Sequence, residues 1–242
     1  EESLSCFERS FYIDQKLQGF LIIKGVLLYK LNRLKESIKC YDEFLSNNPQ
    51  SVDAFKSRGL SFAKLGNYSK ALEDFNKALS INSHDADALN NQGLTFVELK
   101  RYEEALDCYN KVLSTDPNNI ISLNNKGIAL QKTDLSEEAY DCYAKILLID
   151  PCNIDALNNV GITLVELKRY KEALVCYNKA FSLNPNCSEN LYSKSYLLLL
   201  TGYLQEGFKL YENRWHVESF KAKIRYFEQP LWLGEEDLSG KT

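Results

Sequence analysis

Residues 154–187, IDALNNVGITLVELKRYKEALVCYNKAFSLNPNC, contain the pattern that decides the fold. Apolar and small residues recur there at the spacing of one helix face in two runs, which predicts helices over 154–167 and 170–183. The positions that set this spacing are Leu157, Gly161, Leu164, Ala173, Tyr177 and Ala180. Because the connector LKRY is so short, the two helices should form an antiparallel hairpin.

The same residue types return every 34 residues along the chain. One series is Gly25, Gly59, Gly93, Gly127 and Gly161, and a second is Tyr41, Phe75, Tyr109, Tyr143, Tyr177 and Tyr211. A fixed period of this length predicts an array of stacked repeats, each of which buries its apolar face on its neighbours. The repeats fall at residues 18–51, 52–85, 86–119, 120–153 and 154–187.

Small residues are expected at the helix crossings. Gly161 and Ala173 would let the two backbones approach closely, and Tyr177 is expected to fill the gap toward the next repeat. The fourth repeat departs from the pattern, because Ser136 replaces the tyrosine that begins the second helix in other copies. There we expect Asp134 or Ser136 to cap that helix.

Six positions of residues 154–187 carry a family resemblance. Leu157, Gly161, Leu164, Ala173, Tyr177 and Pro185 resemble the signature of the tetratricopeptide repeat (TPR) family, and the match recurs in the repeats before them. The resemblance implies an all-α fold, namely a right-handed superhelical TPR solenoid of antiparallel helix pairs. It also implies that the first helices line a concave surface on which partner segments bind.

The chain extends beyond the five repeats of residues 18–187 on both sides. Residues 1–17 resemble the second helix of a truncated preceding repeat, so the chain is expected to begin in mid-repeat. Residues 188–217 predict a degenerate capping hairpin. Residues 218–242 lose helical periodicity and predict an extended linker toward an absent downstream domain.

A second resemblance lies near the C-terminus. The stretch GYLQEGFKLYENRW at 202–215, followed by PLWLGE at 230–235, resembles a junction found in certain bacterial proteins. In those proteins a TPR array precedes a GT-B domain related to the O-linked N-acetylglucosamine transferases. The resemblance implies an alternative function, in which this chain is the substrate-recruiting arm of a larger glycosyltransferase-like enzyme.

Composition argues against several other classes of protein. The net charge of −4 without a basic block argues against nucleic-acid binding, and the apolar runs are too short for a membrane span. Five of the seven cysteines share one repeat position, too far apart for a disulfide or a shared metal. We therefore expect reduced, semi-buried thiols in a cytoplasmic protein with no metal and no cofactor.

No catalytic arrangement is visible in the sequence. His84 and His216 are far apart along the chain, and the ending GEEDLSGKT lacks the glycine spacing of a phosphate-binding loop. We therefore predict no catalytic residue and no enzymatic activity for this chain itself.

Asparagines recur on the predicted first helices. Asn91, Asn125 and Asn159 occupy one repeat position, with Asn90, Asn124 and Asn158 immediately before them. A primary amide both donates and accepts, so a row of amides suits the backbone of an extended peptide. The row also resembles the asparagine ladder of the O-linked N-acetylglucosamine transferases. The alternative is ordinary TPR usage, in which these amides are solvated or bonded within their own repeat.

Acidic residues recur at the start of the same helices. Asp53, Asp87, Asp155 and Glu189 share one position, with several lysines nearby. They predict either a mixed-charge groove for basic or polar segments, or a solvated face whose acids suit the helix dipole.

The leading hypothesis is a protein-interaction module that binds an extended peptide or partner segment in its concave groove. Its predicted site comprises Asn91, Asn125 and Asn159, flanked by Asn90, Asn124, Asn158, Asp87 and Asp155. A third hypothesis is a scaffold that self-assembles through open repeat ends.

Overall fold

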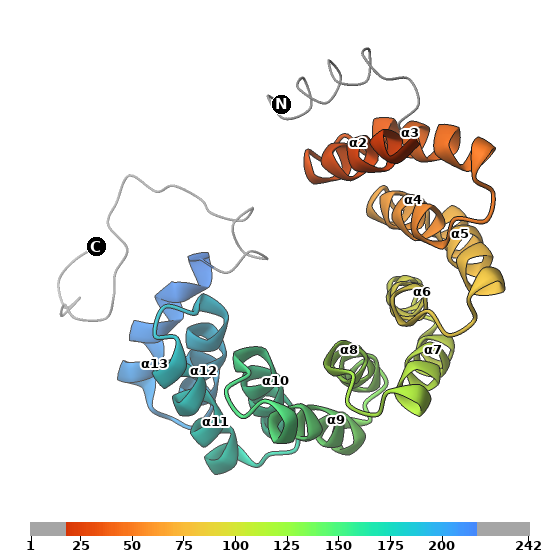
Figure 1. Cartoon of the computed structure of the whole chain (residues 1–242). Coiled ribbons are helices and arrows are strands. Elements are labelled where there is room, and N and C mark those ends of the chain that lie inside the picture. Colours follow the sequence, from red (N-terminus) through yellow and green to blue (C-terminus); the bar gives the residue numbers. More distant parts are fainter. Residues whose placement is uncertain (1–17, 217–242) are drawn as a thin grey trace, which may run out of the picture. The chain divides into compact units, whose positions relative to one another are not determined.

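A computed structural model describes residues 18–216, which form twelve α-helices and one 3₁₀ helix and contain no strand (Figure 1). The helices are α2 Gln18–Lys30, α3 Leu34–Asn47, α4 Val52–Lys64, α5 Tyr68–Ile81, α6 Ala86–Glu98, α7 Tyr102–Thr115, α8 Ile120–Gln131, α9 Ser136–Ile149, α10 Ile154–Glu166, α11 Tyr170–Leu183, α12 Ser188–Leu200, α13 Leu204–Tyr211 and the 3₁₀ helix η1 Glu212–His216. The even-numbered helices are called the first helices below, since each opens a repeat.

The helices pair as the sequence predicts. α10 and α11 cover the two expected ranges to within one residue, and they pack against each other as a hairpin. The same pairing joins α2 with α3, α4 with α5, α6 with α7 and α12 with α13 (Figure 1). The all-α fold of antiparallel helix pairs is confirmed.

The chain divides into two compact units, residues 1–129 and 130–242, with the division inside α8. The proposed preceding half-repeat at 1–17 and the linker at 218–242 lie outside the described residues. Of the stretch resembling a glycosyltransferase junction, residues 230–235 lie there too, whereas residues 202–215 fall on the turn before α13, on α13 and on η1. That resemblance stays a prediction.

A residue in the left-handed region separates the two helices of each of the six described hairpins. The φ angle there is 59° to 60° at Asn32, Lys100, Asp134 and Lys168, and larger at Gly66 and Gly202. This turn corrects one expectation in the fourth repeat, because it moves Asp134 out of the capping position. Leu135 precedes α9 without a side-chain hydrogen bond, and Ser136 instead donates to Glu166. Neither Asp134 nor Ser136 caps the helix.

In four hairpins the helix crossing is made by a glycine under an aromatic ring, whereas Ser195 takes the glycine position in α12. A methyl group on Gly161 would lie 2.5 Å from the ring of Tyr177, and one on Gly59 would lie 2.7 Å from the ring of Phe75. Gly25 and Gly93 stand in the same relation to Tyr41 and Tyr109. Tyr177 therefore covers the glycine of its own repeat, and it also lines a cavity that faces α12 of the next repeat.

Two further positions, 16 residues apart, couple the helices of a hairpin. In α4 and α5 the guanidinium of Arg58 donates from Nε and Nη2 to the Asp74 carboxylate at 2.8 and 2.7 Å, and from Nη1 to Asp42 at 2.6 Å. The hydrogen bond to Asp74 raises the pKa of Arg58 above its ordinary value. In α6 and α7 the equivalent pair is neutral, with the Cys108 thiol donating to Gln92 Oε1 at 3.3 Å.

Candidate functional site

A groove of about 380 Å³ lies between the first helices α4 and α6 and is called the α4–α6 groove. Its lining residues are Tyr29, Leu60, Ala63, Lys64, Tyr68, Phe75, Asn91, Leu94, Thr95 and Glu98. Most of them are apolar or aromatic, and the ring of Phe75 forms the part nearest the glycine crossing. A mostly apolar cavity of this size with a few polar groups is a usual form of a ligand-binding site.

Asn91 is the amide of this groove. Its side chain is half-buried and forms no hydrogen bond within residues 18–216, while its backbone carbonyl accepts a hydrogen bond from Thr95 Oγ1 at 2.8 Å. The primary amide therefore keeps both a donor and an acceptor for a ligand.

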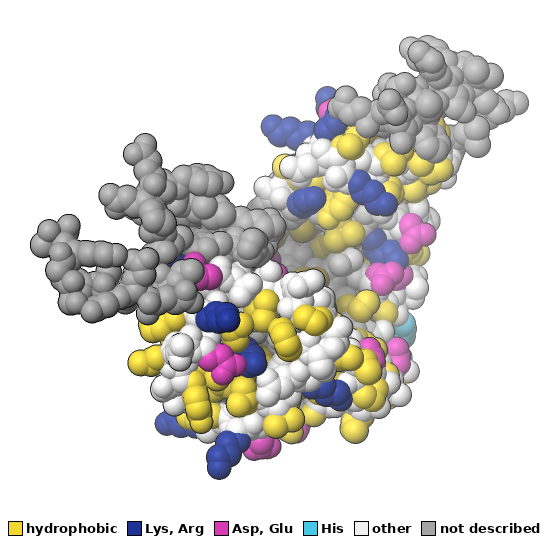
Figure 2. Space-filling view, turned by 90° about the vertical axis from the view of Figure 1, so that its left-hand side faces the viewer, with side chains coloured by type: hydrophobic (Ala, Val, Ile, Leu, Met, Phe, Trp, Pro, Cys, Tyr) yellow, Lys and Arg dark blue, Asp and Glu magenta, His cyan; other side chains and the backbone are white. Residues whose placement is uncertain are grey.

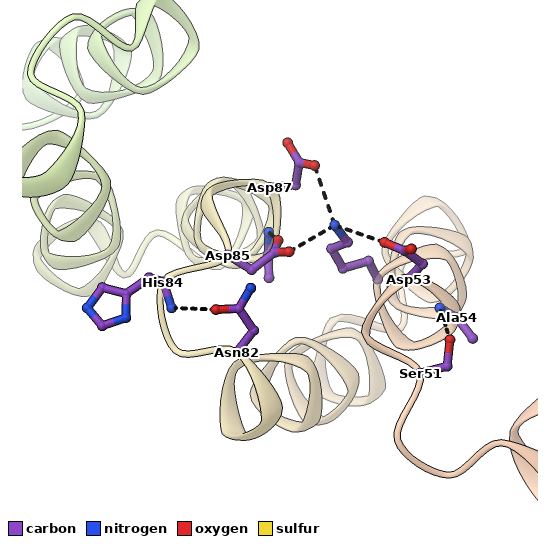
Figure 3. A network of polar contacts seen from close by, with 9 residues as sticks. Ser51, Asp53, Ala54, Asn82, His84, Asp85 and Asp87 are labelled. Carbon is purple, nitrogen blue, oxygen red and sulfur yellow. Dashed lines mark hydrogen bonds and ion pairs between the residues drawn. The ribbon is translucent and has the colours of Figure 1, made fainter.

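An ion cluster lies at the start of the same two helices, as Figure 3 shows. Lys56 Nζ is 3.2 Å from Asp53, 3.1 Å from Asp85 and 3.4 Å from Asp87. Asp85 is also the N-cap of α6, accepting from the backbone N–H of Ala88 at 2.8 Å. Lys56 thus ties α4 to the start of α6, which explains its position without a ligand.

Exposure within the cluster is uneven. The side chain of Lys56 is only 14% exposed, whereas those of Asp53 and Asp87 are 83% and 75% exposed. Burial lowers the pKa of Lys56, but its hydrogen bonds to Asp85 and Asp53 outweigh burial and raise that pKa above its ordinary value. The ammonium is therefore held charged beneath two solvent-facing carboxylates.

The second unit contains a groove at the equivalent junction, between α10 and α12, with a volume of about 510 Å³. The residues lining this α10–α12 groove are Ile162, Val165, Glu166, Lys168, Tyr170, Tyr177, Tyr192, Ser193, Tyr196 and Leu200. Ser193 takes the place of Asn91, and Tyr196 the place of Leu94. The junction is thus a recurring cavity whose lining differs between repeats.

The predicted asparagines have different environments. Asn91 lines a groove, and Asn125 is buried with an exposed fraction of 8%. Asn124 and Asn159 are half-buried and have interactions of their own. Asn90 is a correction: it is buried and accepts a hydrogen bond from Ser122 Oγ at 2.8 Å, so it joins two repeats and does not flank a groove.

The other residues predicted to flank the site also differ in their environments. Asp87 and Asp155 are exposed, as a ligand-facing role requires. Asn158 Oδ1 is buried without a hydrogen bond, and so are both side-chain polar atoms of Asn190, the residue that takes the place of Ser122 in the second unit. The sequence reasoning missed the position directly after the repeat glycine, or after Ser195 in α12, which supplies an apolar or aromatic residue to each groove. The 34-residue period places Leu60, Leu94, Ile162 and Tyr196 at that position.

Within residues 18–216 no group of three His, Cys, Asp or Glu side chains is placed to hold a metal ion. No helix in that range combines the length and apolar character that crossing a bilayer requires.

Comparison with protein families identifies the repeat. Tetratricopeptide repeat models match residues 52–85, 86–119, 154–187 and 19–51, which together make up more than half of the chain. The chain therefore belongs to the tetratricopeptide repeat family. Comparison with curated proteins found no significant match.

Solved structures show the same fold. YrrB, described as a TPR protein with an unusual peptide-binding site, is 23% identical, covers 78% of this chain and 97% of its own, and has a TM-score of 0.58. A TPR protein from Parabacteroides merdae is 17% identical and covers 91% and 88% of the two chains, with a TM-score of 0.73. The protein pilF of Pseudomonas aeruginosa is 18% identical and covers 86% of this chain and 97% of its own, with a TM-score of 0.71.

Proposed function

We propose that this chain is a protein-interaction module that binds an extended peptide segment on the face formed by its first helices. The observation that carries the proposal is the α4–α6 groove, where an apolar cavity lies beside the unpaired amide of Asn91. The cavity accepts one apolar side chain of the ligand, while the amide pairs with the N–H and C=O of the ligand backbone.

Two further points support the proposal. The equivalent α10–α12 groove offers a second apolar cavity, with Tyr196 53% exposed and Leu200 49% exposed at the surface. Partner-binding surfaces are enriched in such aromatic side chains. The similar protein YrrB has a peptide-binding site, which makes peptide binding a reasonable function for an array of this kind.

A peptide-array or pull-down screen tests the proposal. The whole chain would be compared with a triple variant, Asn91→Ala, Asn125→Ala and Asn159→Ala, and with Asn110→Ala, which alters an exposed asparagine of α7. We expect the triple variant to lose binding and Asn110→Ala to retain it, since only the first three amides belong to the proposed row. Unchanged binding in a correctly folded triple variant, judged by circular dichroism, would sink the idea.

A second candidate function, self-association, is favoured by the exposure of α13. Tyr203, Leu204 and Phe208 are 63%, 56% and 55% exposed. Figure 2 shows hydrophobic side chains on this face of the second unit, interspersed with charged ones. The comparable helix α11 is covered by the next first helix, α12, so a helix of this repeat type from a second copy is the occupant that fits α13.

Light scattering over a range of protein concentrations tests this candidate. We expect a dimer that weakens in the double variant Leu204→Ser and Phe208→Ser, because the change removes apolar area from the contact. A chain that stays monomeric at high concentration would exclude it.

A further inference from the structure

We propose that the α4–α6 groove selects segments in which a basic residue directly adjoins a bulky apolar residue. This inference rests on the proposed peptide-binding function and adds the chemistry of the ligand.

The relevant side chains follow one face of each helix. On α6, Asp87, Asn91 and Leu94 have the spacing i, i+4, i+7, so Asp87 lies about 6 Å along the axis on one side of Asn91 and Leu94 about 4.5 Å on the other. On α4, Asp53 and Leu60 repeat the two outer positions. The order along the groove is therefore a carboxylate end, an amide and an apolar end.

A ligand backbone held at Asn91 would present its side chains to both ends. Successive side chains of an extended chain point in opposite directions. When one enters the cavity beside Leu60 and Leu94, the next points toward Asp53 and Asp87. An extended lysine or arginine side chain spans about 6 Å and reaches those carboxylates.

The charges favour a cation at that end. One ammonium, that of Lys56, serves three carboxylates, and the two solvent-facing ones, Asp53 and Asp87, belong to a cluster with an excess of negative charge. At the apolar end, Lys64 and Glu98 carry opposite charges, and Lys64 Nζ lies 4.7 Å from the ring centroid of Tyr29. Electrostatic complementarity therefore places a basic ligand residue at the helix starts and sets its order relative to the apolar one.

Three synthetic peptides test this arrangement: acetyl-SGSGRLGSGS, its isomer acetyl-SGSRGLGSGS, and acetyl-SGSGQLGSGS. Binding to the full chain with labelled leucine methyl groups is followed by NMR at low ionic strength, with Leu60 and Leu94 reporting on the groove. We expect the first peptide to bind about fivefold tighter than its isomer and about tenfold tighter than the glutamine peptide. The double variant Asp53→Asn and Asp87→Asn should reduce the first peptide to the level of the glutamine peptide.

The matched control is Glu103→Gln with Asp107→Asn, which neutralises two exposed carboxylates of the second helix α7. It should leave the preference at Leu60 and Leu94 intact. Equal affinity for all three peptides would overturn the inference and leave the proposed function standing. If no peptide moved any leucine methyl signal, both would fail.

Discussion

The repeats at 52–85 and 154–187 have helices of the same lengths and different chemistry inside them. Each consists of a helix of 13 residues and a helix of 14 residues. A ring covers a glycine in both, Phe75 over Gly59 and Tyr177 over Gly161. The two coupled positions 16 residues apart hold Arg58 and Asp74 in the first repeat, and Val160 and Cys176 in the second.

Positions of three kinds can be distinguished within the repeat. The glycine under a ring recurs, because any added side chain there would push the two helices apart. The coupled pair 16 residues apart can be ionic or neutral, provided that neither member is left as an unpaired buried charge. The groove face is the third kind of position, where Asn91 and Leu94 in one unit correspond to Ser193 and Tyr196 in the other.

The largest expected effect on stability comes from breaking the ion pair between Arg58 and Asp74. Asp74→Ala leaves the guanidinium of Arg58, which is 15% exposed, with the exposed Asp42 as its one carboxylate partner among the described residues, beside the ring of Phe55. We expect the free energy of unfolding in urea to fall by about 3 kcal/mol. Cys176→Ala, the equivalent change in the other repeat, should lower it by only about 1 kcal/mol.

A double variant sharpens this prediction. Arg58→Val with Asp74→Cys installs the pair found at 160 and 176 and should recover most of the lost stability, since no buried charge remains. If Asp74→Ala unfolded at the same urea concentration as the parent chain, Asp42 and solvent would be sufficient partners for Arg58.

The next effect concerns the shared glycine contact. Gly161→Leu should lower the free energy of unfolding by about 1–3 kcal/mol, because a methyl group already lies 2.5 Å from the Tyr177 ring. Gly59→Leu should behave alike if the contact defines both repeats. Gly19→Ala, with open space around its added methyl group, serves as the control and should not destabilise the chain. A Gly161→Leu protein that melts like the parent would refute the packing assignment.

A smaller effect is expected at the grooves. Asn91→Ser gives the first groove the residue of the second, and it should weaken peptide binding there about fivefold, or about 1 kcal/mol, by removing an amide pair. Fluorescence anisotropy with a peptide from the binding screen measures this. Ser193→Asn should strengthen binding in the second unit. If neither change alters affinity, the amide does not distinguish the two grooves.

The last prediction concerns how the stability of the folded chain depends on alkaline pH, and it has no effect at neutral pH. Burial raises the pKa of the Cys108 thiol from 9.0 to about 11, and burial also raises the pKa of Tyr109 and Tyr177 above 10.0. Above pH 9 the unfolded chain loses these protons before the folded chain does, so stability should fall as pH rises from 9 to 11. Urea unfolding at several pH values measures the slope. A flat profile over that range would mean that these groups ionise without unfolding.

The sequence predicted the fold well because the period repeats the same evidence several times. The bounds of α10 and α11 and the glycines under the rings of four hairpins follow from residue spacing alone. Asn90 and Asn91 show the limit of that reasoning. Adjacent residues of a helix point about 100° apart, so one amide lies between repeats while the other lines a groove.

The missed cap at Asp134 has a similar cause. A capping residue and a left-handed turn residue are both commonly aspartate, and the sequence does not distinguish them. The individual cavities between neighbouring first helices were not predicted. The volume of such a cavity depends on how much space the rings of Tyr68 and Phe75 leave between the two helices.

The coupled pair also determines how this array could be rebuilt. A chimera that joined α4 to the second helix of the repeat at 154–187 would place Arg58 opposite a cysteine, and the reverse chimera would place Asp74 opposite Val160. Either product buries an unmatched charge. Whole hairpins, by contrast, carry both members with them. Recombination of this array should therefore succeed at hairpin boundaries and fail within the hairpin of α4 and α5.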